Sequence, residues 1–399
     1  MKTICIDLRA LQIGHQNRGI GMHIRSILEN LPESDSQYIF YCFDKNNPIE
    51  ELGIKTKVSY KIVQTPTINT VLDSPKNILG IFRLVFHRFT PIKNRRIDTF
   101  IQFDFMLGLP RWRNIRKVMI GYDLIPIIMK NEYMPNIRQA WHHSIGKRAK
   151  LKSLLRSPYY RFRYKMHYRS YKRADRIVCI SDYAAQSFEK FLKIPKQKIV
   201  SIPLAPVLPS RLADDSILLD VEKPYIFYIG GTDSRKNIQD IVSAFNIACG
   251  RGNKLSLVLA GNEFSEVNKI PDTAGRNAII ESPYRDSIYL KGFVTDTQKN
   301  ALYQHAHAFI FASHSEGFGL PVVEAMSMSC PVIAYNNSSI PEAAGTSARL
   351  VSTGDFVAIA IEISLIFNAT LRKDLVDSGK KQASKFTWEK YVKKFQEIL

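Results

Sequence analysis

Cysteines are few in this sequence, and they lie far apart. The five of them (Cys5, Cys42, Cys179, Cys249 and Cys330) stand singly along 399 residues. This pattern has neither the spacing of a zinc site nor that of a disulfide framework. Scattered single cysteines are typical of a reducing compartment, where thiols stay free. We therefore expect these five side chains to serve as ordinary apolar residues.

Long uncharged runs are also missing. No stretch reaches the roughly 20 apolar residues that a helix needs to cross a bilayer, so we expect no membrane-spanning helix. Residues 1–9 meet charge too early for a signal peptide and have the pattern of a strand. The sequence therefore predicts a cytoplasmic protein.

Acidic residues are scarce in the first half of the chain. Residues 1–205 hold 36 lysines and arginines against 15 acidic residues, whereas the remainder holds 20 against 21. The net charge of +20 thus belongs entirely to the first half. A uniformly basic nucleic-acid-binding protein needs no such division, so the division favours a domain that faces an anionic surface.

The densest basic segment is residues 147–176, with 12 lysines and arginines against one acidic residue. Four tyrosines share one helical face by their spacing: Tyr160, Tyr164, Tyr168 and Tyr171. The neighbouring stripe consists of Arg161, Lys165, Arg169 and Lys172. We expect the tyrosines to pack on a sheet. The cations, each worth about 1 kcal/mol near an anionic bilayer, predict a membrane-facing surface.

The length and the hydrophobic content of 45% suffice for two globular domains. Strand-like and helix-like segments alternate, which predicts an α/β fold with two doubly wound domains. We expect an amino-terminal domain at 1–205, a linker at 206–222, a second domain at 223–384 and a final amphipathic helix at 385–399. The expected strands are 3–11, 38–43, 58–63, 99–103, 117–123, 176–181, 199–202, 225–230, 255–260, 288–292, 308–312, 331–335 and 348–351. The expected helices of the second domain include 237–248, 296–304 and 321–329.

Glu316 and Glu324 stand eight residues apart, directly after the expected strand at 308–312. Glycines 317 and 319 allow a tight turn, and Pro321 suits the first position of a helix, with Glu324 in the opening turn of that helix. Loop amides and an open helix end would then offer donors to an anion. We expect the two carboxylates to flank one ligand, one on each side of its phosphates. The alternative is a strand-loop-helix connection with two solvated glutamates.

This segment resembles the paired-glutamate motif of retaining glycosyltransferases of family four. The resemblance implies the GT-B fold, in which two Rossmann-like domains face each other across a cleft. It implies that Glu316 is catalytic and lies beside the donor sugar, and that Glu324 binds the nucleotide ribose. The same loop would bind the donor through Gly317, Phe318, Gly319 and Leu320. The final helix would cross back onto the first domain.

Arg235 and Lys236 follow the expected strand at 225–230 and precede a helix. Negative charge grows on a departing diphosphate, so a transferase needs cations there. The resemblance assigns this role to Arg235 and Lys236. Many family members have the arginine directly after the second glycine, where this chain has Thr232, which we expect to contact the donor. The alternative is a pair of solvated cations at a helix start.

Two further segments are similar to donor-binding elements of the family. Gly19 and Gly21 follow the first strand in a Gly-x-Gly loop, and the resemblance implies that this loop approaches the diphosphate. The stretch 292–294 resembles one that lines the nucleobase pocket, which gives Val294 a place in nucleotide binding.

Residues 121–126 resemble a strand-end motif of mannosyltransferase-like members that commonly begins with histidine. Tyr122 stands in place of that histidine. Asp123 is retained, either as an acceptor-side base or as the residue that fixes the loop through an Asx turn. The Gly-x-Gly loop, residues 121–126 and the Arg235-Lys236 segment look most like those of mannosyltransferases that use GDP-mannose. We therefore expect GDP-mannose as the donor, with UDP-sugars as the alternative.

The sequence thus predicts a retaining hexosyltransferase for a lipid-linked or growing saccharide, in surface polysaccharide or O-antigen synthesis, on the inner face of the cell membrane. No Asp-x-Asp tripeptide occurs, so we expect no metal and no cofactor beyond the nucleotide-sugar substrate. Two readings from other classes are a basic nucleic-acid-binding protein and a non-catalytic nucleotide-sugar sensor.

Overall fold

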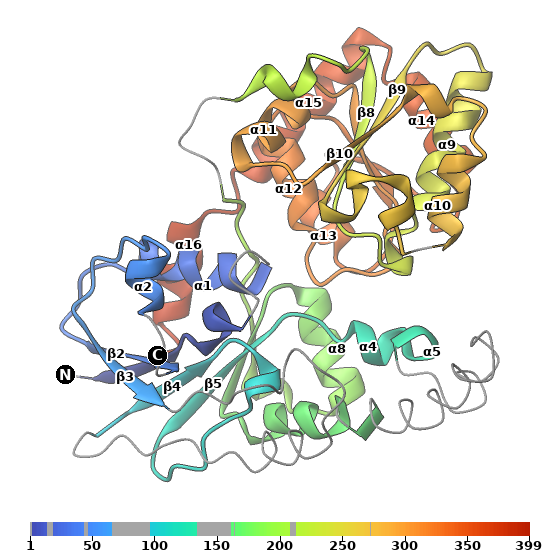
Figure 1. Cartoon of the computed structure of the whole chain (residues 1–399). Coiled ribbons are helices and arrows are strands. Elements are labelled where there is room, and N and C mark those ends of the chain that lie inside the picture. The colour runs from blue at the N-terminus through green and yellow to red at the C-terminus, as the bar shows by residue number, and fades with distance from the viewer. Residues whose placement is uncertain are drawn as a thin grey trace. The chain divides into compact units, whose positions relative to one another are not determined.

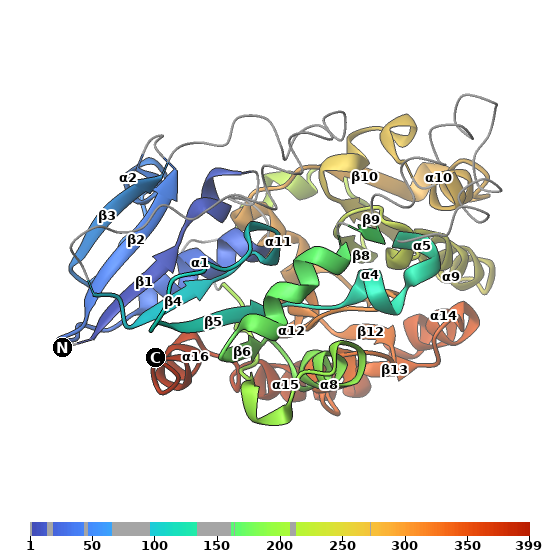
Figure 2. The ribbon, with the colours of Figure 1, turned by 90° about the horizontal axis from the view of Figure 1, so that it is seen from below.

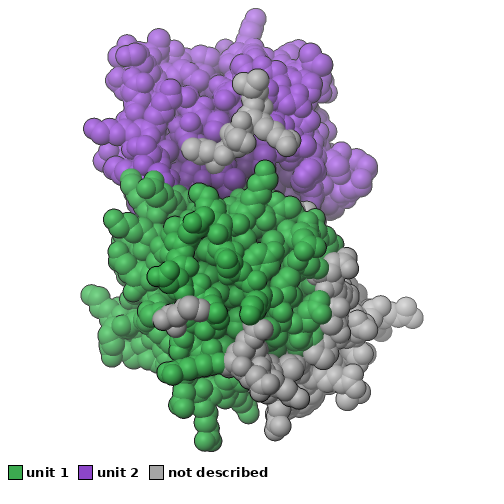
Figure 3. Space-filling view, turned by 90° about the vertical axis from the view of Figure 1, so that its left-hand side faces the viewer, with its two compact units in different colours: residues 1–203, 388–399 green, residues 204–387 purple. Residues whose placement is uncertain are grey.

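A computed structural model describes residues 2–13, 19–43, 47–65, 96–133, 161–162, 164–207, 213–271 and 273–399. The chain divides into two compact units (Figures 1 and 3). Unit 1 comprises Met1–Pro203 and Trp388–Leu399, and unit 2 comprises Leu204–Thr387. No helix in these described ranges is both long enough and apolar enough to cross a membrane.

Unit 1 is built on a seven-stranded sheet in the order β3-β2-β1-β4-β5-β6-β7, and Figure 2 shows β1, β2 and β3 side by side. Every pair of neighbouring strands in it is parallel. The central strands β1, β4, β5 and β6 are mostly buried, as expected for a parallel sheet. The edge strands β3 and β7 are only partly buried. The strands are β1 (Thr3–Asp7), β2 (Gln37–Phe43), β3 (Tyr60–Thr65), β4 (Thr99–Gln102), β5 (Arg116–Gly121), β6 (Arg176–Cys179) and β7 (Ile199–Ser201).

Helices cover both faces of this sheet. The described α-helices of unit 1 are α1 (Gly19–Asn30), α2 (Pro48–Glu51), α4 (Ile125–Ile128), α5 (Lys130–Tyr133), α8 (Asp182–Leu192) and α16 (Trp388–Gln396). Residues 164–173 are helical as well. Helix α16 packs on α1, whereas the 164–173 helix and α8 share a core through Tyr171 and Phe188, whose rings meet edge to face.

The predicted tyrosine face is confirmed where the structure describes it. Tyr168 and Tyr171 are buried, and Tyr164 packs against the same core. Lys165, Arg169 and Lys172 are exposed beside them. Tyr160 and the rest of the basic segment at 147–160 lie outside the described residues.

Unit 2 repeats the architecture with six parallel strands in the order β10-β9-β8-β11-β12-β13. The strands are β8 (Tyr225–Ile229), β9 (Ser256–Ala260), β10 (Ile288–Gly292), β11 (Ala308–Phe311), β12 (Val332–Tyr335) and β13 (Arg349–Val351). The α-helices are α9 (Ile238–Gly250), α10 (Thr273–Ile280), α11 (Asp296–His305), α12 (Leu320–Ser327), α13 (Ile340–Ala344), α14 (Phe356–Leu365) and α15 (Ala369–Ala383).

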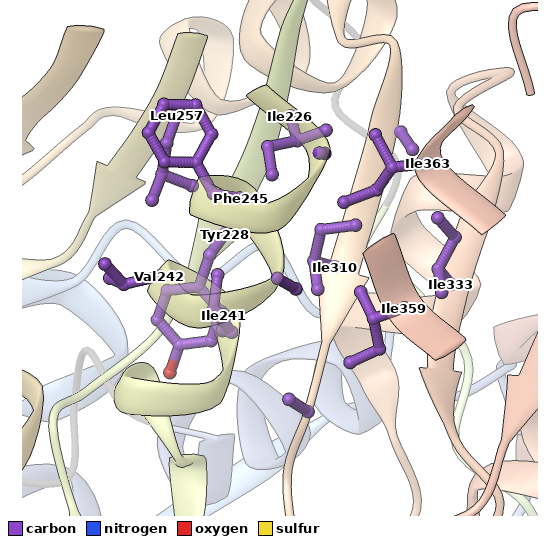
Figure 4. Packing of buried hydrophobic residues seen from close by; sticks show 14 of the residues in the cluster. Ile226, Tyr228, Ile241, Val242, Phe245, Leu257, Ile310, Ile333, Ile359 and Ile363 are labelled. Carbon is purple, nitrogen blue, oxygen red and sulfur yellow. The ribbon is translucent and has the colours of Figure 1, made fainter. Parts of the chain in front are cut away.

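The core of unit 2 fills both faces of its sheet. On one face, α9 and α14 pack against each other and onto the strands. Figure 4 shows Phe245 of α9 near Tyr228 and Leu257, and Ile359 of α14 near Ile310. On the other face, aromatic rings of β8, β11 and α11 meet edge to face. This two-sided burial fixes the strands that carry the site.

Each of the thirteen expected strands has a counterpart in the structure, with bounds that differ by a few residues. The largest error is the first strand, which was expected to reach Leu11. It ends at Asp7 because the Asp7 carboxylate accepts hydrogen bonds from the backbone and side chain of Arg9. A 3-10 helix, Arg9–Gln12, follows. The predicted linker at 206–222 falls within unit 2, where the Asp214 amide donates to the Thr297 carbonyl.

Candidate functional site

The sheet of unit 2 brings two loops together at its switch point. From the central strand β8 the chain proceeds outward through β9 and β10, and it then returns to β11 on the other side of β8. The loops that follow β8 and β11 therefore leave the sheet at the same edge in opposite directions. Ligands of doubly wound proteins bind at this point. The first loop carries Arg235 and Lys236, and the second carries Glu316.

The carboxylate of Glu316 is the centre of the site. Its Oε1 atom accepts hydrogen bonds from Arg235 Nη1 at 2.7 Å, Lys236 Nζ at 2.6 Å and Ser313 Oγ at 2.6 Å. Arg235 also donates to the Ser315 carbonyl at 2.8 Å. The side chains of Arg235, Lys236 and Glu316 are only 17%, 13% and 12% exposed. The two cations are therefore ion-paired and largely buried, and the interpretation of them as solvated is wrong.

Two cations around one carboxylate leave a positive charge in excess. Burial alone raises the pKa of Glu316, but the charges of Lys236 and Arg235 outweigh it and lower that pKa overall. Burial lowers the pKa of Lys236, and the repulsion from Arg235 adds to this effect, although Glu316 opposes both. Asp233 lies 3.7 Å from Arg235 Nε and also acts on Lys236, but it is 42% exposed, so it offsets the two cations only in part. The cluster therefore offers positive charge to an anionic ligand.

The backbone around Glu316 is fixed by the loop that follows β12. Ser338 Oγ accepts a hydrogen bond from the Glu316 amide, and Ser339 Oγ donates to the Glu316 carbonyl. Asn337 donates to the Ser313 carbonyl at 3.1 Å. These bonds fix the backbone of the loop after β11.

Glu324 lies in α12, which begins at Leu320, one residue before the expected start. Glu324 is consequently in the second turn of the helix. It is buried, and its Oε1 atom lies 3.3 Å from Lys299 Nζ. Glu316 and Glu324 thus take part in two different sets of ion pairs. The interpretation of them as solvated glutamates is also wrong.

The loop between Glu316 and α12 is shaped by glycine. Gly319 has a φ of +95°, and a Cβ atom there would lie 2.8 Å from Ile340 Cδ1. Phe318 turns its side chain into the interior, where its ring meets that of Phe386 edge to face at 5.3 Å. A ligand could therefore use the backbone of Phe318 but not its ring. Gly317 is buried beside it, and Leu320 is half-buried at the helix start.

Sequence reasoning missed three side chains that support the site. Ser313 binds Glu316, as described above. Glu263, after β9, accepts hydrogen bonds from the amide and hydroxyl of Thr232 at 2.7 and 2.5 Å, so it fixes the loop that leads to Arg235. Lys299 binds Glu324. Their only sequence signal is position: each lies just after a strand or in the first turn of a helix at the carboxyl edge of the sheet. Val294, also at this edge, is buried.

Two glycines allow the ends of β8 and β9 to approach closely at the carboxyl edge of the unit 2 sheet. Gly261 has a φ of +139°, and a Cβ atom there would lie 2.1 Å from the Gly230 carbonyl oxygen. We expect Gly261→Ala to destabilise unit 2 by about 3 kcal/mol, because the ends of β8 and β9 must separate and the backbone is strained. The control is Gly252→Ala, which has φ +92° but open space around the added Cβ. It should cost about 1 kcal/mol. Urea unfolding followed by circular dichroism measures both, and equal losses would contradict the steric account.

The expected site residues of unit 1 lie at the carboxyl edge of its own sheet. Gly19 and Gly21 are in the first turn of α1 rather than in a loop. The Asp123 carboxylate accepts from the Ile125 amide at 3.0 Å, which confirms the Asx turn. The Tyr122 hydroxyl lies 3.0 Å from Nδ1 of His23. Burial lowers the pKa of His23 to about 3, so this imidazole is neutral.

The described residues contain no group of three or more His, Cys, Asp or Glu side chains arranged to hold a metal ion.

Comparisons with known proteins agree with this architecture. A family model for glycosyl transferases group 1 matches residues 211–382, and a model for glycosyltransferase family 4 matches residues 17–205. The chain belongs to this family of glycosyltransferases.

Two curated relatives come from Escherichia coli. O-antigen chain mannosyltransferase B is 29% identical over 239 residues, which cover 57% of this chain and 61% of the relative. A serotype-specific mannosyltransferase is 25% identical over 296 residues, which cover 68% of this chain and 32% of the relative. The matches thus span less than two thirds of the length of either relative.

Among solved structures, sucrose-phosphate synthase from Thermosynechococcus elongatus has a TM-score of 0.71 at 16% identity, with 100% of this chain and 98% of that chain covered. At this identity the likeness concerns the fold alone. The fold is α/β, with two Rossmann-like domains of the GT-B type.

Proposed function

We propose that this protein is a retaining hexosyltransferase that transfers mannose from GDP-mannose to a lipid-linked or growing saccharide. The observation that carries the proposal is the cluster of Arg235, Lys236 and Glu316 at the switch point of unit 2. Family membership supports transfer of a sugar, and the relatives, which are an O-antigen chain mannosyltransferase and a serotype-specific mannosyltransferase, support mannose and an O-antigen type of acceptor.

In this proposal, Arg235 and Lys236 neutralise the diphosphate as it leaves the sugar. Both cations lie at the switch point before the donor binds, so the site already holds positive charge where negative charge develops. The diphosphate competes with Glu316 for them. Glu316 would then be available to orient the donor sugar, and Glu324 would accept hydrogen bonds from the ribose. The acceptor hydroxyl attacks the sugar carbon from the same face that the diphosphate leaves, so the configuration at that carbon is retained. The departing diphosphate takes up the proton of the hydroxyl.

Two fixed cations at the diphosphate position can supply the charge that a divalent metal supplies elsewhere. We therefore propose that transfer needs neither a metal nor any other cofactor. Asp123, at the carboxyl edge of the unit 1 sheet, is proposed to act on the acceptor side.

We further propose that unit 1 docks on an anionic membrane surface at the inner face of the cell membrane. Lys165, Arg169 and Lys172 form an exposed basic stripe, and Phe162 beside it is 54% exposed. Each engaged cation contributes about 1 kcal/mol of attraction to such a surface. An aromatic ring next to the cations fits the interfacial region.

The test begins with binding of GDP, UDP and ADP, measured as shifts in the melting temperature. We expect GDP to give the largest shift. The matching nucleotide-mannose is then supplied with lipid-linked saccharides, and release of the nucleotide is followed by chromatography. Transfer should be undiminished in EDTA. A larger shift with UDP than with GDP would indicate that the donor is a UDP-sugar rather than GDP-mannose. Binding without release of sugar would indicate a non-catalytic sensor, and loss of activity in EDTA would contradict metal independence.

A further inference from the structure

Lys299 is a buried cation that pairs with Glu324 and has no role of its own in the proposed transfer. Its side chain is 12% exposed, and its Nζ atom lies 3.3 Å from Glu324 Oε1 and 3.3 Å from Asp296 Oδ1. Asp296 is 67% exposed, whereas Glu324 is 10% exposed. The Lys299–Glu324 contact is therefore the part of this group that is shielded from solvent.

The first turn of α11 fixes the position of Lys299. Thr295 caps the helix: its hydroxyl accepts from the Gln298 amide, while the Gln298 side chain accepts from the Thr295 amide. This capping box fixes the first turn. Asp296 and Lys299 are three residues apart and share one face of the helix. The helix start thus fixes the backbone of Lys299, and the two carboxylates fix its ammonium group.

A buried carboxylate needs a compensating charge. Burial raises the pKa of Glu324, and the charge of Lys299 opposes that rise. Tyr303 and Asp296, both also on α11, are the other titratable groups that act on Glu324. Lys299 is the only cation among these three residues. Without it, the buried Glu324 would lose the cation that offsets its burial, and the repelling carboxylate of Asp296 would remain.

We infer that Lys299 is a positioning residue that holds the Glu324 carboxylate in one orientation and in its ionised form for the ribose of the donor nucleotide. The inference rests on the proposed function, in which Glu324 accepts hydrogen bonds from the ribose hydroxyls. Lys299 itself need not touch the donor, because its ammonium is already occupied by Glu324 and Asp296.

The experiment measures whether the protein distinguishes a ribose from a sugar without hydroxyls. Dissociation constants for GDP and 2′,3′-dideoxy-GDP are determined by calorimetry for the wild type, Glu324→Gln, Lys299→Met and Lys299→Arg. We expect the wild type to prefer GDP about tenfold. Glu324→Gln and Lys299→Met should both reduce that preference to about twofold or less, and Lys299→Arg should restore part of it. If GDP fails to bind, the UDP pair of ligands is used.

The control is Lys291→Met. Lys291 is similarly buried, at 9% exposure, and pairs with Asp220 in the same unit, so its loss should leave the ribose preference unchanged. Lys299→Gln, which keeps a hydrogen-bond donor without the charge, serves if Lys299→Met does not fold. A full ribose preference in the uncharged Lys299 variant, with Glu324→Gln lacking it, would overturn the inference but not the proposed function. Failure of the wild type to bind either nucleotide would overturn both.

Discussion

Replacing Arg235 or Lys236 with alanine is expected to reduce turnover of the donor about 10²- to 10³-fold, the loss typical of removing one preorganised group that stabilises charge in a transition state. Each variant lacks one of the two cations on Glu316. The remaining cation balances that carboxylate, so the excess positive charge that would meet the diphosphate is gone. Turnover is measured as release of GDP from GDP-mannose, or of UDP if the nucleotide screen selects it.

The single variants should nevertheless fold. Glu316 keeps one cation and the hydroxyl of Ser313 at 2.6 Å, so no buried charge is left without a partner. The melting temperature should therefore fall by only a few degrees. Lys373→Ala is the control, because Lys373 is 78% exposed and pairs only with Asp377 in the ion pairs found. Near-normal turnover in both Arg235→Ala and Lys236→Ala would remove these residues from the proposed mechanism.

The strands of this fold could be predicted because their signal is local. Runs such as Ile177–Cys179 are apolar at every position, which is typical of a strand that a parallel sheet buries on both faces. The boundaries were less certain where a side chain competes with the backbone. Asp7 ends the first strand early by binding the amide of Arg9, and nothing in the apolar pattern marks that event.

The site was predictable as a set of residues but not as a geometry. Glycines, a proline and two glutamates at a fixed spacing pointed to Glu316 and Glu324. However, Lys236 is 80 residues from Glu316 along the chain, and only the order of the strands brings the two together. Lys299 and Glu263 have no motif of their own. Each acts through a long-range contact, so the folded chain was needed to identify them.

The second large effect is a loss of stability, expected when the buried ion pair of Asp7 and Arg9 is broken. The two side chains are 0% and 1% exposed. Arg9 Nε donates to both oxygens of Asp7, at 2.9 and 3.1 Å, and Gln102 donates to Asp7 at 2.8 Å. The guanidinium also lies over the ring of Tyr41, 5.0 Å from its centroid. This network joins the ends of β1, β2 and β4 in the middle of the unit 1 sheet.

Arg9→Met is expected to destabilise unit 1 by about 3–5 kcal/mol, because it leaves the buried carboxylate of Asp7 without its cation. Methionine keeps much of the volume of the arginine stem, so the loss would reflect the charge rather than a cavity. Trp112 and Trp388 belong to unit 1, and residues 204–387 of unit 2 contain no tryptophan. Their fluorescence during urea unfolding therefore reports on unit 1 without a contribution from unit 2.

Two comparison variants test the cause. Asp7→Asn combined with Arg9→Met removes both charges and should recover part of the lost stability, because the cost lies in the unpaired carboxylate. Arg349→Met breaks a comparable two-bond pair with Glu362 in unit 2, where Arg349 is 39% exposed. That change should cost about 1 kcal/mol or less and leave the tryptophan transition unmoved. A loss below about 1 kcal/mol for Arg9→Met would show that water reaches Asp7 and that the pair does not hold the sheet together.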